Sequence, residues 1–385
     1  MTTDAPDHKL HALVSYNRPR NADNHFVNLF TGAVSSDDVQ IHYFTPRYVI
    51  AGRIDVFSLH WPELLAKGSS PVKQLVKYAL LSILIVRIVV ARIPVLYTVH
   101  NEAPHEATRS RWQRFFYRRI TRLVTFRAYL NEAETNDYTH GCVVLHGAYP
   151  VKPSTSRPLR SPVPNVLCFG NVRPYKGLEL VIGAAKIADP STVSFRIVGA
   201  GNDENYLQQL RRQGADVQGL SLEFGYLDDD DLLACIAQSS AAILPYRHMY
   251  NSGVALLALS AGRPILVPDS PANAALASEI GTSWVRILPT SASDEEWARE
   301  ASAAAAHDIA SSGAVPDLSR RQWDDIGGLY RQLLVRIRDL SRSHSRREVP
   351  ARMRSFVEAS PDFVQHSQRN AADSDTEAGA NRVSS

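Results

Sequence analysis

The chain has 385 residues, of which 44% are hydrophobic and 21% are charged. This is the composition of an ordinary globular protein, and it excludes a chain that is disordered throughout. The 42 lysines and arginines nearly balance the 39 acidic residues, and the net charge of +3 gives no reason to expect nucleic acid as a partner. At about 100–200 residues per domain, the length predicts two domains.

The cysteines and the first residues bear on the cellular compartment. Cys142, Cys168 and Cys235 show neither a pairing motif nor metal-ligand spacing. We therefore expect reduced thiols in a cytoplasmic protein. Residues 1–9 are polar and lack the apolar stretch of a secretory signal peptide, so we expect no export signal there.

The first half of the chain contains three short apolar stretches that run into polar residues, at 10–16, 54–63 and 93–106. Segments of helical pattern separate them, and this alternation indicates a parallel α/β sheet. Ligands of such sheets bind beyond the carboxyl ends of the strands. The polar side chains in the loops after these stretches are therefore candidates for a binding site: Asn24, His60, Glu63, His100, Asn101, His105 and Glu106.

Two segments in this half raise the question of a membrane. Residues 78–90 are apolar except for Ser82 and one charged residue, Arg87, but they fall short of the ~20 residues that a transmembrane helix needs. Residues 109–127 carry seven arginines and no acidic residue, with aromatic side chains between the arginines. The two segments are either a buried helix and an ordinary surface helix, or a pair of helices that lies on anionic lipid headgroups.

The second half restarts the α/β pattern after a stretch with five prolines at 150–164, which predicts an interdomain linker. Strand-like runs recur at 165–169, 194–201, 222–226, 241–246 and 263–269. We therefore expect an N-terminal domain at 1–152 and a second doubly wound domain at 163–317. An amphipathic helix at 318–342 completes the fold, and the polar composition of 343–385 predicts a disordered tail.

The second half carries a candidate phosphate site. It has neither the G-x-G-x-x-G of a dinucleotide-binding turn nor the G-x-x-x-x-G-K-[ST] of a P-loop. Instead, Gly170 is followed by Arg173 and Lys176, and Asn251-Ser252-Gly253 precedes an apolar helix. Two cations and a helix N-terminus can neutralise a diphosphate without a metal. Each feature alone also has a plain interpretation, as surface charges and a helix cap.

The motifs together resemble a known family. FGNVRPYKGLELVI (169–182), FRIVGAG (195–201) and PYRHMYNSG (245–253) resemble the donor-domain signature of GT-B glycosyltransferases. With LHWPE (59–63), TVHNEAPHE (98–106) and PDSPANAALASEIG (268–281), they resemble the xanthan-type, GDP-mannose-dependent β-mannosyltransferase family. The similarity runs from about residue 15 to about residue 334.

The resemblance implies a GT-B architecture, in which two Rossmann-like doubly wound domains face a central cleft. It implies a nucleotide-sugar co-substrate, GDP-mannose, used without a metal. The acceptor would be a polyprenyl-diphosphate-linked oligosaccharide at the inner face of the plasma membrane, in polysaccharide biosynthesis. The implied donor-binding residues are Gly170, Arg173, Lys176, Gly199, Tyr246, Asn251, Ser252 and Gly253, and the implied acceptor- or sugar-binding residues are Asn24, His60, His100, Asn101 and His105.

One departure from the larger retaining branch of GT-B enzymes concerns the mechanism. Those enzymes carry two glutamates eight positions apart, where this chain has Met249 and Leu257. The xanthan-type family is inverting, so we expect inversion. An inverting transfer needs a general base on the acceptor side. We expect Glu106, which has two histidines in its loop, and Glu63 second; either could instead be a structural carboxylate.

Other interpretations stay open at this stage. A retaining GT-B transferase with another nucleotide sugar would differ in the anomeric configuration of its product. A GT-B-fold sugar-nucleotide epimerase would not need the basic aromatic segment at 109–127. A catalytically inactive, membrane-associated scaffold of a polysaccharide assembly complex would account for the missing glutamates, but not for the intact Arg173 and Lys176.

Overall fold

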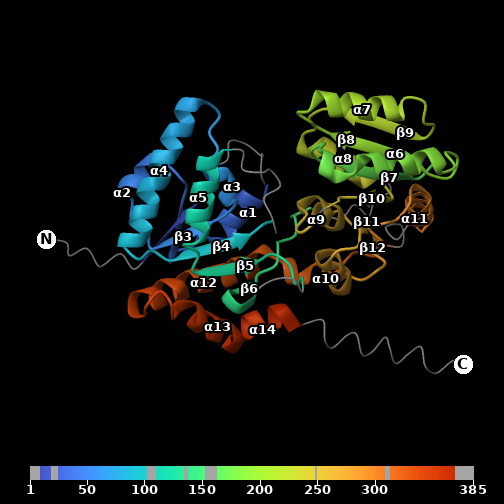
Figure 1. Ribbon diagram of the computed structural model, residues 1–385. Helices are drawn as coiled ribbons and strands as arrows, with labels where there is room; N and C mark the ends of the chain where they lie inside the picture. The colour runs from blue at the N-terminus through green and yellow to red at the C-terminus, as the bar shows by residue number, and fades with distance from the viewer. Residues whose placement is uncertain are drawn as a thin grey trace, which may run out of the picture. The chain divides into compact units, whose positions relative to one another are not determined.

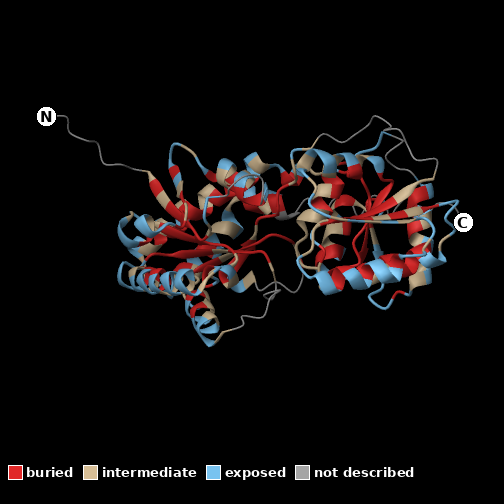
Figure 2. Ribbon diagram, turned by 90° about the horizontal axis from the view of Figure 1, so that it is seen from above, coloured by how far each residue is buried: buried red, intermediate tan, exposed pale blue. Residues whose placement is uncertain are grey.

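The computed structural model describes residues 9–18, 25–101, 110–133, 138–151, 163–247, 249–307 and 313–368. The chain forms two compact units, Met1–Gly147 with Arg320–Ser385, and Ala148–Ser319. Each unit holds a six-stranded parallel sheet with helices packed on both faces (Figure 1). Most of the strand residues are buried, and the outward faces of the helices are exposed (Figure 2). The expected pair of Rossmann-like α/β domains is therefore confirmed.

The first unit has the strand order β2-β1-β3-β4-β5-β6. Its strands are β1 (Leu10–Val14), β2 (Val39–His42), β3 (Val56–Leu59), β4 (Val95–Val99), β5 (Phe126–Tyr129) and β6 (Gly141–Val143). Its helices are α1 (His25–Val34), α2 (Pro46–Ala51), α3 (Pro62–Leu65), α4 (Pro71–Val90), α5 (Arg111–Thr121), α12 (Trp323–Ser343), α13 (Val349–Ala359) and α14 (Pro361–Gln368). One face packs on α1, α12 and α13, and the other on α2, α4 and α5.

The second unit has the strand order β12-β11-β10-β7-β8-β9. From the centre, β7, β8 and β9 follow one another towards one edge of the sheet and β10, β11 and β12 towards the other, so the order of the strands reverses between β10 and β7. Its strands are β7 (Asn165–Phe169), β8 (Ser194–Gly199), β9 (Leu220–Phe224), β10 (Ala241–Ile243), β11 (Ile265–Pro268) and β12 (Val285–Leu288). Its helices are α6 (Leu178–Ile187), α7 (Glu204–Gly214), α8 (Asp229–Gln238), α9 (Gly253–Ser260), α10 (Pro271–Ile280) and α11 (Asp294–Ala306). Ligands of doubly wound sheets bind where the strand order reverses, at the carboxyl edge.

The C-terminal part of the chain differs from the expected disordered tail. Residues 349–359 and 361–368 are the helices α13 and α14, and the apolar residues Val349, Met353 and Phe363 are buried in the core of the first unit. The prediction of disorder is therefore wrong for 343–368. It failed because the few apolar residues there all lie on the buried faces of these helices, which a low average content of aliphatic residues does not reveal. Residues 369–385 lie outside the described residues.

The closing helix also has a definite place. Helix α12 lies beside α1 and belongs to the first unit, so the chain returns to that unit at Arg320 after building the second (Figure 1).

Helix α4 has 20 residues, longer than the apolar segment at 78–90. Its Arg87 guanidinium turns inward and donates to the carbonyls of Tyr48, Val49 and Gly52, where α2 ends. Among the described residues, no helix combines the length and apolar character needed to cross a bilayer.

Candidate functional site

The loop after β7 forms the first part of the candidate site. Gly170 directly follows this strand and has a φ of 98°, a conformation that L side chains rarely adopt. Gly199 ends the neighbouring strand β8, and a Cβ placed on it would lie 2.1 Å from the Gly170 carbonyl oxygen. Only glycine allows these two strand ends to approach so closely, which leaves the backbone bare at the carboxyl edge of the sheet.

Lys176 is the buried cation of this loop. Its side chain is only 5% exposed, and its Nζ lies 4.9 Å from the centre of the Tyr246 ring. Burial is the main cause that lowers the pKa of Lys176 to about 8; Cys168 opposes the shift and Arg173 adds to it. Within the described ranges, neither Lys176 nor Arg173 forms an ion pair. A buried cation without a carboxylate is costly unless an anionic ligand compensates it.

The first turn of α9 lies next to Gly170 and the Nζ of Lys176. A Cβ on Gly170 would lie 3.1 Å from the Lys176 Nζ and 3.2 Å from the Cγ2 of Val254, in the first turn of α9. The Ser252 hydroxyl caps this helix by accepting from the N–H of Ala255 at 3.2 Å. The helix N-terminus, the lysine and the glycine loop therefore converge where a phosphate group would sit.

The structure also shows what occupies the positions of the two missing glutamates. Met249 and Leu257 are half-buried and pack against the apolar core beneath α9. The ring of Tyr246 is buried beneath Lys176, and burial raises the pKa of its hydroxyl. A Cβ on Gly253 would lie 2.5 Å from the Tyr149 hydroxyl oxygen, so a larger residue would disturb the start of α9.

The first unit carries a buried histidine cluster at the carboxyl edge of its sheet. His60 follows β3 and His100 follows β4, and the Nδ1 of His60 lies 3.0 Å from the Nε2 of His100. The Nε2 of His60 lies 3.1 Å from the Ser58 hydroxyl. Burial lowers the pKa of His60 to about 3 and that of His100 well below its usual value, with His60 and His146 adding to the shift of His100. These imidazoles are therefore neutral at physiological pH.

A carboxylate and an amide lie next to this cluster. Glu63 is in the first turn of α3, and burial raises its pKa, although hydrogen bonds from its own backbone and from the Asn101 side chain act against the shift. Burial, and then the charge of Glu63, raise the pKa of the Tyr117 hydroxyl on α5. A half-buried carboxyl group with a raised pKa is typical of a general base or acid.

The structure thus brings together four of the residues selected from the sequence in this unit, namely His60, Glu63, His100 and Asn101. Asn24, His105 and Glu106 lie outside the described residues. Sequence reasoning missed Ser15, Trp61 and His146, which complete the cluster. Trp61 stacks on His100 with ring centres 3.9 Å apart, and burial lowers the pKa of His146 to about 4. The motif LHWPE contained Trp61, but nothing in it marked the indole as part of the site.

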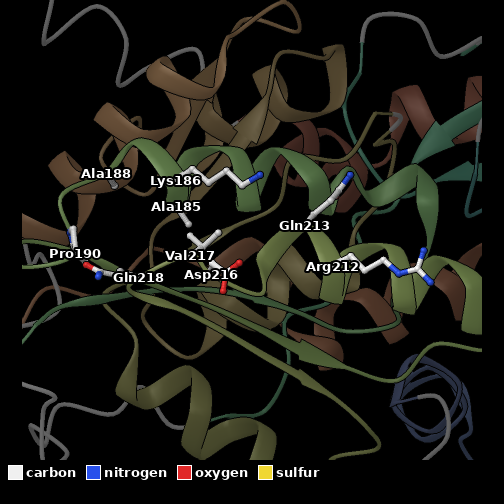
Figure 3. Close-up of a pocket in the computed structure, with 9 residues that line it drawn as sticks. All are labelled: Ala185, Lys186, Ala188, Pro190, Arg212, Gln213, Asp216, Val217 and Gln218. Carbon is white, nitrogen blue, oxygen red and sulfur yellow. The ribbon is translucent and has the colours of Figure 1, made fainter.

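A surface pocket of about 570 Å³ lies elsewhere on the second unit (Figure 3). Its lining comes from the ends of α6 and α7 and from the residues before β8 and β9, including Lys186, Arg212 and Asp216. This is the amino edge of the sheet, opposite to Gly170 and Gly199. Lys186 and Arg212 lie in the last turns of their helices, where cations stabilise the helix C-terminus. The pocket is therefore separate from the loop that carries Gly170 and Lys176.

Comparison with known proteins identifies the family. The chain is 31% identical over 337 residues to a protein of Xanthomonas campestris pv. campestris named GDP-mannose:glycolipid 4-beta-D-mannosyltransferase, across 86% of this chain and 93% of the relative. A second protein with the same name, from another strain, is 31% identical over 332 residues. The chain belongs to this glycosyltransferase family. Residues 163–306 of this glycosyltransferase also match the family described as "Glycosyl transferases group 1".

Solved structures with a similar fold include a protein in complex with a nucleotide sugar and a named glycosyltransferase. The Anabaena protein Alr3699/HepE in complex with UDP-glucose superposes with a TM-score of 0.57 at 13% identity, covering 85% of this chain and 100% of that one. WaaG, a glycosyltransferase involved in lipopolysaccharide biosynthesis, has a TM-score of 0.52 at 14% identity, covering 91% and 100% of the two chains. The expected GT-B fold of this family member is confirmed.

Proposed function

We propose that this glycosyltransferase moves mannose from GDP-mannose to a lipid-linked oligosaccharide, with inversion at the anomeric carbon. The observation that carries the proposal is the convergence of Gly170, Lys176 and the first turn of α9 at one point, in a chain whose relatives are named GDP-mannose:glycolipid 4-beta-D-mannosyltransferases. The geometry supports a diphosphate site, and the names of the relatives support the donor and the acceptor class.

On the donor side, Lys176 and Arg173 neutralise the diphosphate while the N–H groups at the start of α9 bind its oxygens. The same groups stabilise the departing GDP, whose charge grows as the bond to the sugar breaks. Asn251 and Ser252 fix the loop that leads into α9, and Gly199 leaves room for the nucleotide beside Gly170. These contacts supply the positive charge that a metal would otherwise provide, which supports a metal-independent reaction.

On the acceptor side, a carboxylate of the first unit takes the proton from the attacking hydroxyl. Two glutamates compete for this role. Glu63 has the raised pKa and the hydrogen bond from Asn101 that suit a base held in place. Glu106, in the loop with His105, remains the other candidate. The pair of His60 and His100 supports the turn that carries Glu63, and Asn24, His105 and Asn101 would bind sugar hydroxyls.

We further propose that the enzyme works at the cytoplasmic face of the plasma membrane in exopolysaccharide assembly. Helix α5 exposes Trp112 and Phe115 at 55% and 43% among exposed arginines, while Phe116 and Ile120 are buried in the core. The neighbouring α4 exposes an apolar stripe: Val72, Leu75, Val76, Ile83, Val86, Val89 and Val90. We call these exposed residues of α4 and α5, together with Arg111, Arg118 and Arg119, the α4–α5 surface.

The mixture of charged and aromatic side chains favours lipid as the partner of the α4–α5 surface. The guanidinium groups of Arg111 and Arg119 lie 5.9 and 5.4 Å from the ring centres of Trp112 and Phe115, so charge and aromatic surface are interleaved. Helices with this combination bind the interface of anionic membranes. A lipid-linked acceptor diphosphate would also be attracted by the arginines.

The test is a donor panel assayed for nucleoside diphosphate release in the presence of a polyprenyl-diphosphate oligosaccharide. Release with GDP-mannose, and little with UDP-glucose or UDP-galactose, is the expected result. Release with a UDP-sugar instead would establish another donor. The absence of release with every donor would support the inactive scaffold. A vesicle of phosphatidylglycerol, compared with one of phosphatidylcholine, separately tests the α4–α5 surface.

A further inference from the structure

The turn that joins β3 to α3 is strained at one aromatic residue. Trp61 has φ 41° and ψ 62°, the left-handed helical region. Bulky side chains rarely adopt this conformation, and a residue before a proline, here Pro62, is normally extended. Among the described residues, Arg92 is the only other non-glycine residue with a positive φ. Such strain persists where the surroundings enforce it, which is common at functional sites.

The surroundings of Trp61 hold this conformation from both sides. Ser15, at the end of β1, accepts from the His60 N–H at 2.7 Å and donates its hydroxyl to the His60 carbonyl at 2.7 Å. After the strained residue, the Leu64 N–H donates to the Trp61 carbonyl at 2.9 Å. The backbone is therefore fixed immediately before and after the indole.

The result of this strain is a flat aromatic surface at the carboxyl edge of the sheet. The indole lies on the His100 imidazole with ring centres 3.9 Å apart and an angle of 21° between the planes. Phe26 packs edge-on against it at 5.8 Å, and Tyr16 lies at 6.1 Å. The indole remains half-buried, so His100 covers part of it while another part is open to solvent. Burial keeps His100 uncharged, so the imidazole supports the indole as a neutral stacking partner.

The polar groups beside this surface are those that bind sugar hydroxyls. Asn101 follows His100 directly, and its amide donates to Glu63, two residues after Trp61. The apolar C–H face of a pyranose packs on an aromatic ring, and its hydroxyl groups need hydrogen-bond donors and acceptors at the edge. An indole with a carboxylate and an amide next to it offers both kinds of contact.

We propose that Trp61 is the stacking platform for the acceptor sugar, with the C–H face of the pyranose on the indole and its hydroxyls on Glu63 and Asn101. This inference rests on the proposed function, because it assigns the acceptor site of the same reaction. It also explains why a strained tryptophan occupies a turn in which glycine would relieve the strain. A residue that only filled the core would not need its ring at this edge.

The test uses a short-chain lipid diphosphate disaccharide as acceptor, in detergent, with initial rates measured against acceptor and against GDP-mannose. Trp61→Leu removes the aromatic face, and Trp61→Gly removes the ring and also relieves the strain. Both are expected to raise the KM for the acceptor about threefold to tenfold, the size of an aromatic contact. The KM for GDP-mannose is expected to stay the same. Trp61→Phe keeps an aromatic face and is expected to restore most of the acceptor affinity.

Leu64→Ala, on the exposed side of the same short helix, is the matched control and is expected to leave both KM values unchanged. A fall in kcat with an unchanged acceptor KM in Trp61→Leu would overturn the inference, because the indole would then act only by positioning Glu63. Calorimetric titration of the disaccharide acceptor into wild-type and Trp61→Leu protein separates this inference from the proposed function, because it measures acceptor binding without any donor. If GDP-mannose proves not to be the donor, weaker acceptor binding by Trp61→Leu still supports the platform, and equal binding contradicts it.

Discussion

The ammonium group of Lys176 lies over the ring of Tyr246, with the Nζ 4.9 Å from the ring centre and the lysine side chain 5% exposed. The ring's negative face partly compensates the charge, as cation–π contacts do. A phosphate ligand would compensate it more fully, because it adds an opposite charge in a poorly solvated place. This relationship is the reason why we propose the lysine as the centre of the donor site.

Replacement of Lys176 should therefore weaken catalysis with the donor. We expect Lys176→Met to lower kcat/KM for GDP-mannose about 10²–10³-fold, the usual effect of removing one group that stabilises developing negative charge. Steady-state rates at saturating acceptor provide the measurement. Lys186→Met, on the same stretch of chain but in the pocket of Figure 3, is the control and should retain wild-type kinetics. Equal losses in the two variants would contradict the assignment.

The lowered pKa of Lys176 also predicts how donor use depends on pH. Burial brings this pKa to about 8, so the free enzyme loses the positive charge as the pH rises through that value. We expect kcat/KM for GDP-mannose to fall above pH 8. Lys176→Arg keeps its charge at these pH values and should flatten the profile. An alkaline limb of the same shape in the arginine variant would assign it to another group.

The lowered pKa of Lys176 also affects the stability of the fold. The charged form is needed for the proposed donor site, but it makes the folded state less stable. Between the folded pKa of about 8 and the ordinary value of 10.5, the unfolded chain binds more protons than the folded one. Burial of the charge therefore destabilises the fold most fully below pH 8. We expect Lys176→Met to raise the melting temperature at pH 7 and to increase the free energy of unfolding by at most about 3 kcal/mol. A lower melting temperature in a well-folded variant would mean that the lysine stabilises the free enzyme.

The choice between the two candidate bases can be made by substitution. One of the two substitutions Glu63→Gln and Glu106→Gln removes the general base. That variant should reduce turnover about 10²–10⁴-fold and leave the binding of GDP-mannose intact. Because burial raises the pKa of Glu63, wild-type activity should fall as the pH drops through this raised value. If Glu63 is the base, the glutamine variant should have no such acid limb in its residual rate. Turnover within a few-fold of wild type in both variants would exclude both glutamates.

The C-terminal helix α14 makes hydrogen bonds to the segment around Arg320, where the chain returns to the first unit. The imidazole Nε2 of His366 accepts from the Leu145 N–H at 3.1 Å, and the His366 carbonyl accepts from the Arg320 Nε at 3.0 Å. Arg320 also forms an ion pair with Glu132. We expect His366→Ala to lower the free energy of unfolding by about 1–3 kcal/mol, because the buried Leu145 N–H loses its acceptor. His366→Gln, whose amide oxygen can accept instead, should recover part of this loss in urea denaturation.

Local patterns predicted much of the fold, and they also drew attention to the loop of the proposed donor site. The loop with Gly170, Arg173 and Lys176 is contiguous in the sequence, so its chemistry could be recognised before its geometry was known. The stacking of Trp61 on His100 could not be predicted, because it depends on a left-handed backbone and on contacts from residues far apart in the sequence. The inward direction of the Arg87 side chain could not be predicted either, because three carbonyls at the end of α2 determine it.

The mistaken tail prediction has a related cause. Val349, Met353 and Phe363 are few among polar residues, and their burial follows from the apolar surface that α12 and β6 present to them. The aromatic side chains of α5 are a further example. Phe116 is buried against Tyr78 of α4, while Trp112 and Phe115 stay exposed. The sequence of 109–127 does not by itself separate the aromatic side chains that become buried from those that stay exposed.

The most direct test of the central claim is the anomeric configuration of the product. Wild-type protein, GDP-mannose and a short-chain lipid diphosphate oligosaccharide would be incubated together, and the isolated product examined by NMR through the one-bond C1–H1 coupling of the new mannose. The proposed reaction predicts one added mannose in a β-linkage, formed in step with the release of GDP. An α-linked mannose, or no transfer from GDP-mannose, would contradict it.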